Sequence, residues 1–155
     1  CSSVDLADEI MRAEHIVIGP GPGRPEISPL SMEIANRALS GNHKVLGICL
    51  GHQALGIADG MELIECPSGP VHGIPESIKY DAKGLFSSKG EGVMTRYNSL
   101  ILSGESNQLE VNITDDTGRL IMGLTDGNNV HGLQFHPESI GSVNGSELIA
   151  NFLRT

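Results

Sequence analysis

Tryptophan is absent from this chain of 155 residues, and all aromatic residues together make up only 3% of it. The core must therefore rest on aliphatic side chains and methionine. Long apolar runs are absent too: none approaches the roughly 20 residues that a membrane-spanning helix needs, and no signal peptide is visible. These features predict one domain with its own core and no membrane contact.

Basic residues are scarce, with 10 Lys and Arg against 19 Asp and Glu, so the formal net charge is −9. Nucleic acids and anionic membranes bind basic surfaces, so we expect neither as a partner. Cysteine is also scarce, and the three thiols are Cys1, Cys49 and Cys66. A small and odd number of cysteines predicts free thiols in a reducing, cytoplasmic setting rather than a disulfide framework.

The order of strand-like and helix-like segments changes along the chain. In the first third we expect strands at 15–18 and 44–48 and helices at 4–13, 28–39 and 51–58. Short strand-like pieces then dominate residues 61–125, with strands expected at 62–65, 77–80, 110–114 and 120–124. A further strand is expected at 130–135, and a final helix at 147–153 has Ser146 as its candidate cap. This pattern predicts an α/β fold with a mostly parallel central sheet and helices on both faces.

The pentapeptide Gly47-Ile48-Cys49-Leu50-Gly51 joins an apolar strand to a predicted helix. This pattern is typical of a nucleophile elbow, with cysteine in the place that serine usually takes. So tight a turn leaves no room for side chains at the flanking glycines. We expect the N-terminus of the following helix to favour the reactive thiolate of Cys49. The alternative is a buried structural cysteine followed by a glycine turn.

A cysteine nucleophile needs a base, and His136 is the favoured one of six histidines. It follows an apolar strand, and Glu138 lies two residues on, beyond a proline that stiffens the turn. A carboxylate that orients an imidazole is the general arrangement of a catalytic triad. The alternative is an ordinary surface turn. No metal site is expected, because the chain has neither a Cys-x-x-Cys nor a His-Glu-x-x-His motif.

A loop rich in glycine and proline, residues 19–25, follows the predicted strand at 15–18. A dinucleotide-binding loop is the first alternative, but prolines remove N–H donors and delay the next helix, and no Lys-Ser/Thr pair follows as in a P-loop. Acyl transfer needs an oxyanion hole, and the residue after the nucleophile, here Leu50, usually gives one N–H donor. We expect Gly21 or Gly23 to give the second.

Cys1 offers a different nucleophile, since an N-terminal cysteine can use its own amine as the base. The segment after Cys1 is helix-like rather than strand-like, and no partner motif follows it. We therefore favour Cys49.

Four motifs together span nearly the whole chain. They are Pro20-Gly21-Pro22-Gly23-x-Pro25, Gly47-Ile48-Cys49-Leu50-Gly51-His52-Gln53, Arg96-Tyr97-Asn98-Ser99-Leu100 and Gln134-Phe135-His136-Pro137-Glu138-Ser139. In this order they resemble class I glutamine amidotransferase domains. The chain is most similar to the small subunit of anthranilate synthase and its aminodeoxychorismate synthase relative. The resemblance implies a flavodoxin-like, three-layer fold.

The resemblance also implies a glutaminase reaction through a Cys-His-Glu triad. In such domains the cysteine at the position of Cys49 attacks the side-chain amide of L-glutamine. The histidine at His136 protonates the departing ammonia, and the carboxylate at Glu138 orients that histidine. Water then cleaves the glutamyl thioester, and this half-reaction needs no metal or other cofactor.

Substrate and partner contacts follow from the same resemblance. The side chain of Gln53 and the backbone of Ser99 and Leu100 would hold the amino and carboxylate ends of glutamine. Ammonia would pass to a chorismate-binding synthase subunit or fused domain, which in this family uses magnesium. That partner selects the product, which is anthranilate, aminodeoxychorismate or a related aminated chorismate.

The chain departs from the family pattern at several places, modestly at residues 69–73 and more clearly at the N-terminus and at Asn98. Family members usually begin with a strand-helix-strand segment before the position of His15, so we expect the amidotransferase domain at 1–155 to be N-terminally incomplete. Asn98 replaces the usual histidine of its motif and cannot titrate. Alternatives to a channelling glutaminase remain: a non-catalytic docking or regulatory subunit of the synthase, a glutaminase serving another synthase, and a stand-alone hydrolase.

Overall fold

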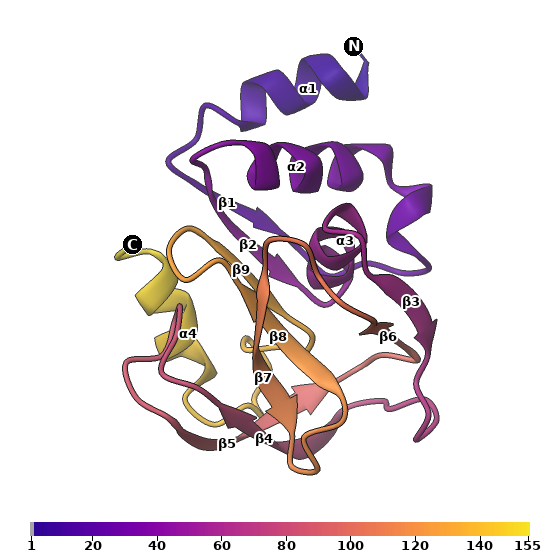
Figure 1. Ribbon diagram of the computed structural model, residues 1–155, viewed down its shortest axis with the longest axis vertical. Helices are drawn as coiled ribbons and strands as arrows, with labels where there is room; N and C mark the ends of the chain where they lie inside the picture. Colours follow the sequence, from indigo (N-terminus) through magenta and orange to yellow (C-terminus); the bar gives the residue numbers. More distant parts are fainter. Residues whose placement is uncertain (1) are drawn as a thin grey trace.

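The computed structural model describes residues 2–155, so Cys1, considered above as an N-terminal nucleophile, lies outside the described residues. The elements follow in chain order (Figure 1) as α1 (Ser3–Ile10), β1 (His15–Ile18), the 3-10 helix η1 (Pro25–Ile27), α2 (Pro29–Ser40), β2 (Lys44–Ile48), α3 (Leu50–Ala58), β3 (Glu62–Glu65), β4 (Ile74–Tyr80), β5 (Gly90–Arg96), β6 (Leu100–Ser103), β7 (Glu110–Asp115), β8 (Ile121–Thr125), β9 (Val130–Leu133) and α4 (Gly145–Phe152). Among residues 2–155, no helix combines the length and the apolar character needed to cross a membrane.

The central sheet has seven strands in the order β1-β2-β9-β8-β7-β4-β5. The pairs β1–β2 and β2–β9 are parallel, and the remaining pairs from β9 to β5 are antiparallel. Strands β3 and β6 form a separate antiparallel pair. The predicted α/β class is confirmed. Its sheet is mixed, with the parallel part confined to the three strands that carry the candidate site.

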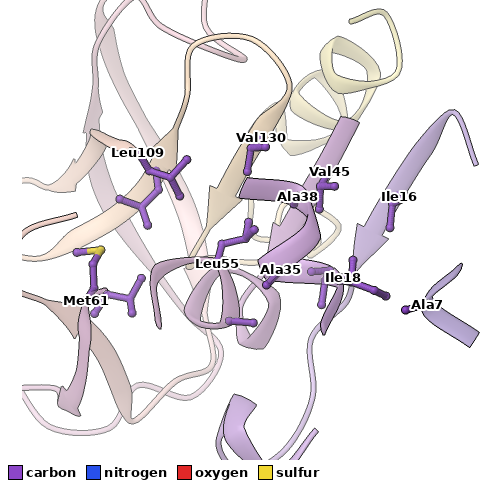
Figure 2. Packing of buried hydrophobic residues seen from close by; sticks show 14 residues of the cluster. Ala7, Ile16, Ile18, Ala35, Ala38, Val45, Leu55, Met61, Leu109 and Val130 are labelled. Atoms are coloured by element: carbon purple, nitrogen blue, oxygen red, sulfur yellow. The ribbon is translucent and has the colours of Figure 1, made fainter. Parts of the chain in front are cut away.

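Helices cover both faces of the sheet, as predicted. Val45 and Leu46 are consecutive on β2 and fully buried, and they belong to separate core clusters. The cluster of Val45 packs β1 and β2 against α1, α2 and α3 (Figure 2), and its members are aliphatic or methionine. The cluster of Leu46 lies under α4 and includes Phe135 and Phe152, two of only three phenylalanines in the chain. The structure is therefore a three-layer sandwich.

Helix α4 begins earlier than the sequence pattern predicts. Its N-cap is Asn144, with a φ of 58°, rather than Ser146. A Cβ on Gly145 would lie 2.0 Å from the carbonyl oxygen of Pro137, so the first turn of the helix lies directly against the turn after β9. Since only glycine permits that approach, the contact places the start of α4 at this point.

His52 is buried between α3 and β9. A Cβ on Gly132 of β9 would lie 2.6 Å from Nδ1 of His52, which shows how closely helix and strand approach. Within residues 2–155 neither ring nitrogen of His52 has a hydrogen-bond partner. Burial therefore lowers the pKa of His52 to about 3, and the ring is neutral when the protein is folded at neutral pH.

The neutral His52 should make stability depend on pH. In the unfolded chain His52 binds a proton below its ordinary pKa of 6.5, whereas in the folded chain it stays neutral down to about pH 3. This contribution to stability is thus fully present above pH 6.5 and is lost as pH falls toward 3. Between about pH 7 and about pH 5, protonation of His52 in the unfolded chain should lower the free energy of unfolding by about 2 kcal/mol. We expect this decrease to be absent in His52→Leu.

Urea unfolding at both pH values measures this difference. His72 is exposed, so His72→Leu serves as the control and should keep the pH dependence of the unaltered chain. Equal pH dependence in His52→Leu and the control would contradict the burial argument.

Candidate active site

The candidate site lies where the three parallel strands end. The glycine-proline loop follows β1, Cys49 follows β2, and the segment from Gln134 to Glu138 follows β9. Parallel strands place their carboxyl ends at one edge of a sheet, so segments far apart in the sequence meet there. The Cys49 N–H donates to the Leu133 carbonyl oxygen at 2.8 Å, which joins the second and third of these segments directly.

The turn at Cys49 is a strained elbow. Cys49 has φ 52° and ψ −102°, a conformation that side chains rarely adopt, and it is the N-cap of α3. A Cβ on Gly47 would lie 2.5 Å from the backbone carbonyl of Gly51, and one on Gly51 would lie 2.1 Å from the carbonyl oxygen of Ile18. The predicted exclusion of side chains at both flanking glycines is confirmed.

The expectation that the site favours the Cys49 thiolate is wrong, because the net shift of the Cys49 pKa is upward. The sulfur is buried, and this burial raises the pKa of the Cys49 thiol above its ordinary value. The backbone N–H of Leu50 at the start of α3 lowers that pKa, as expected, but by less, and the charge of Glu138 raises it further. The helix N-terminus thus acts in the predicted sense, yet the resting form is the thiol.

His136 and Glu138 form the predicted pair. Nδ1 of His136 lies 2.7 Å from Oε1 of Glu138, and the ring of Tyr97 packs edge-on against the imidazole with a centroid separation of 4.9 Å. The backbone is also fixed, since the His136 N–H donates to the Thr95 carbonyl at 2.9 Å and the Ser142 hydroxyl donates to the His136 carbonyl at 2.5 Å. Nε2 of His136 is buried and has no partner within residues 2–155, which leaves it open for proton transfer.

A cavity of about 370 Å³ opens at the elbow. Its lining residues are Gly21, Pro22, Gly23, Arg24, Cys49, Gln53, Tyr97, Asn98, Ser99 and Leu100. The cavity thus brings together every predicted substrate-contact or oxyanion residue except Leu50, whose side chain lines a neighbouring cleft. Tyr97, which also packs on His136, links the cavity to the histidine-glutamate pair. The volume suits a small polar molecule the size of an amino acid.

Sequence reasoning did not assign a role to Gln134. Its side chain is fully buried, its Nε2 lies 3.8 Å from the Cys49 sulfur, and its Oε1 accepts from Nε2 of Gln53 at 3.2 Å. The available signal was a polar residue at the end of an otherwise apolar strand. Such a residue requires partners inside the fold.

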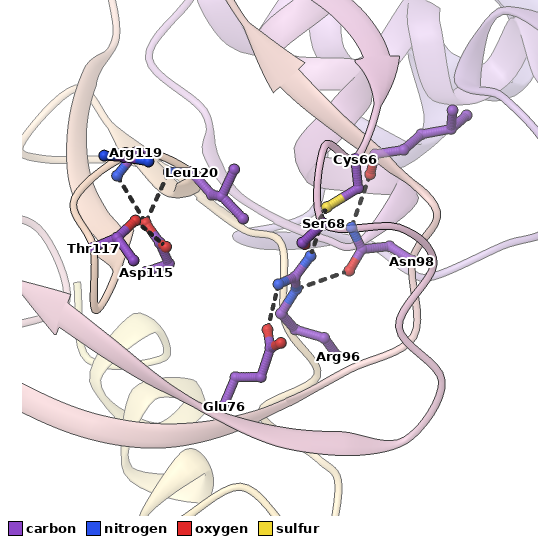
Figure 3. A network of polar contacts seen from close by, with 10 residues as sticks. Cys66, Ser68, Glu76, Arg96, Asn98, Asp115, Thr117, Arg119 and Leu120 are labelled. Atoms are coloured by element: carbon purple, nitrogen blue, oxygen red, sulfur yellow. Dashed lines mark hydrogen bonds and ion pairs between the residues drawn. The ribbon is translucent and has the colours of Figure 1, made fainter.

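Arg96 and Asn98 belong to one network of polar contacts (Figure 3), and Asn98 also lines the cavity. The Arg96 guanidinium is buried, paired with Glu76, and donates from Nε to the Asn98 side-chain oxygen at 3.1 Å and from Nη2 to the Cys66 sulfur at 3.6 Å. The Asn98 amide then donates to the Leu100 carbonyl at 2.9 Å. The neutral Asn98 amide therefore connects the charged Arg96 guanidinium to the Leu100 carbonyl. In the part of the chain that the structure describes, no group of three or more His, Cys, Asp and Glu side chains is placed to hold a metal ion.

Comparison with known proteins identifies the family. The family model described as "Glutamine amidotransferase class-I" matches residues 2–155. The chain belongs to this family. The amidotransferase chain is 39% identical over 153 residues to anthranilate synthase component 2 of Cyanophora paradoxa. The aligned region covers 94% of this chain and 79% of that protein. It is 35% identical over 155 residues to aminodeoxychorismate synthase component 2 of Escherichia coli, covering 97% and 82% respectively.

Further relatives of the amidotransferase chain differ in length. It is 42% identical over 143 residues to the bifunctional protein TrpGD of Thermotoga maritima, covering 90% of this chain but 24% of that protein. Among solved structures, a protein of Thermoplasma acidophilum described as part of a GMP synthase superposes with a TM-score of 0.81 at 16% identity, over 96% of this chain and 75% of that one. At such identity the likeness supports the fold alone.

The close approach at Gly51 predicts a large effect of one methyl group. We expect Gly51→Ala to lower the free energy of unfolding by about 3 kcal/mol, because both atoms in conflict belong to backbone segments that are held by other contacts. Gly19→Ala is the matched control, since a Cβ on Gly19 has nothing within 4 Å. Urea unfolding compares the two. Equal midpoints would show that α3 is not held against β1 as described.

Proposed function

We propose that this amidotransferase chain is the glutaminase subunit or domain of a chorismate-using synthase. It hydrolyses L-glutamine through a thioester on Cys49 and supplies ammonia to the synthase. One observation carries the proposal: a cysteine held in a strained elbow shares one edge of the sheet with a histidine whose Nδ1 is held by Glu138 and whose Nε2 is unpartnered within residues 2–155. That arrangement supplies both a nucleophile and an oriented base.

The raised pKa of Cys49 makes the base necessary for the first step. Nε2 of His136 takes the thiol proton as the sulfur bonds to the carboxamide carbon of glutamine. The carbonyl oxygen becomes an oxyanion, which the N–H of Leu50 and the loop at Gly21 and Gly23 stabilise. His136 then gives its proton to the nitrogen, the C–N bond breaks and ammonia leaves.

Hydrolysis of the thioester repeats the same proton transfers. Water loses a proton to His136 as its oxygen bonds to the acyl carbon, the C–S bond breaks, and the proton returns to the sulfur to regenerate the thiol. Glu138 stabilises the imidazolium in both steps. Glutamate is the second product.

The cavity accounts for substrate recognition. The side chain of Gln53 and the backbone of Ser99 and Leu100 line the cavity together with Cys49, so a molecule that places its amide at the sulfur also meets these groups. In this proposal they bind the amino and carboxylate ends of glutamine. Such contacts fix the reacting carbon beside the nucleophile, which is where binding contributes most to rate.

The proposed partner is a protein that binds chorismate. Component 2 proteins of both anthranilate synthase and aminodeoxychorismate synthase are among the relatives, and they support this class of partner without separating the two products. Magnesium belongs to the partner in this proposal, and the chain described here uses no metal or cofactor. The net charge of −9 argues against nucleic acid as a partner, and the buried free thiols fit a cytoplasmic location.

Replacement of the nucleophile tests the proposal. In the complex with the synthase, Cys49→Ser should lower glutamine-dependent ammonia release by about 1,000-fold or more, while synthesis from added ammonium salts continues. Cys66→Ser removes the other described thiol, which lies outside the cavity, and should leave ammonia release unchanged. Glutaminase activity that survives in Cys49→Ser would overturn the assignment of the nucleophile.

A further inference from the structure

Two buried amide side chains connect the cavity wall to the nucleophile. Gln53 is 3% exposed and Gln134 is 0% exposed. The Gln53 Nε2 donates to the Leu100 carbonyl oxygen at 3.0 Å and to Oε1 of Gln134 at 3.2 Å, and the Gln134 Nε2 lies 3.8 Å from the Cys49 sulfur. Polar groups this deeply buried are costly unless they are hydrogen-bonded, so the contacts fix the side chains.

The Leu100 carbonyl determines which groups donate and which accept in this series of hydrogen bonds. The Leu100 carbonyl can only accept, so the Gln53 atom that faces it must be the NH₂ group. That same nitrogen faces Gln134, which must therefore turn its carbonyl oxygen toward Gln53. The remaining end of the Gln134 amide, which faces the sulfur, is then an N–H donor. A flipped Gln53 amide would place two acceptors face to face at Leu100.

We propose that Gln134 is a positioning residue for Cys49, holding an N–H donor against the sulfur so that the thiolate forms and stays aligned inside the buried site. This inference rests on the proposed glutaminase function. A hydrogen-bond donor that points at the sulfur favours the thiolate. The Gln134 N–H therefore opposes the effect of burial, which raises the pKa of Cys49. It acts in the same sense as the Leu50 N–H but comes from the end of β9 rather than from α3.

The arrangement also couples the substrate-binding wall to the nucleophile. The Leu100 carbonyl accepts from both Asn98 and Gln53, so both of its lone pairs are used and its orientation is fixed. The backbone proposed to hold one end of glutamine is thereby tied through two amides to the sulfur at the other end. Because the Leu100 carbonyl keeps its bonds to Asn98 and Gln53, loss of the Gln134 amide should disturb the nucleophile more than the binding of substrate.

The test uses two substitutions of Gln134 and one control. Gln134→Met keeps the length of the side chain but removes the donor. Gln134→Glu keeps the size and the contact with Gln53 but places an acceptor and a negative charge at the sulfur. Asn112→Leu is the control, because Asn112 is a buried amide on β7 outside the cavity. The readout is the rate of alkylation of Cys49 by iodoacetamide across pH, resolved by mass spectrometry of the Cys49 peptide, together with kcat and KM for glutamine.

We expect the alkylation midpoint to rise by about one pH unit in Gln134→Met, which is about tenfold less thiolate at a given pH below the midpoint. The rise should be larger in Gln134→Glu because like charges disfavour each other, and absent in Asn112→Leu. In Gln134→Met, kcat should fall by about tenfold, with a smaller change in KM.

Other outcomes separate the two proposals. Unchanged midpoints in both Gln134 variants would overturn the positioning role even if the unaltered chain releases ammonia. A chain that releases no ammonia with its synthase, yet shows the shifted midpoints, would overturn the glutaminase function and leave the contact between Gln134 and Cys49 established. Gln134→Glu preserves packing volume, so it decides the question if Gln134→Met does not fold.

Discussion

The candidate site depends on one steric constraint, the absence of side-chain volume at Gly47 and Gly51. Helix α3 approaches β1 and β2 so closely that a single methyl group at either glycine would overlap backbone atoms. The chain passes from strand to helix in this space with Cys49 at a positive φ. The strain is offset by burial of Val45, Leu46 and their neighbours on both faces of the sheet. The elbow then presents the sulfur to the cavity.

Burial at the elbow disfavours the thiolate of Cys49, and the surrounding polar groups oppose this effect. A buried thiol resists ionisation, so the helix N-terminus alone does not produce a resting thiolate. The structure instead surrounds the sulfur with neutral donors, from Leu50 and Gln134, and places an oriented imidazole at the same sheet edge. In the proposed mechanism the charge is therefore formed only when His136 accepts the proton.

Much of this architecture could be predicted from local sequence. The strands at 15–18, 44–48 and 62–65 have the predicted bounds. Gly19 follows the first strand, Asn42 precedes the second, and Gly60 and Pro67 flank the third. Strand β5 was not predicted, since Gly90, Gly92 and the adjoining polar residues give no alternating pattern, and it is paired with β4. Strand β6 was not predicted either, although it is a short apolar run, and it is paired with β3. The direction of the Cys49 pKa and the role of Gln134 also escaped prediction. Both depend on burial and on contacts between segments far apart in the chain, as the Cys49–Gln134 separation of 85 residues shows.

The most direct test of the proposed mechanism is to trap the covalent intermediate. The synthase complex is mixed with isotopically labelled L-glutamine, quenched in acid within the first turnover, digested and analysed by mass spectrometry. We predict a glutamyl adduct on the peptide that contains Cys49, and no adduct when Cys49→Ser is treated in the same way. Ammonia release with no adduct on Cys49, or with an adduct on another residue, would contradict the central claim that the elbow cysteine is the nucleophile.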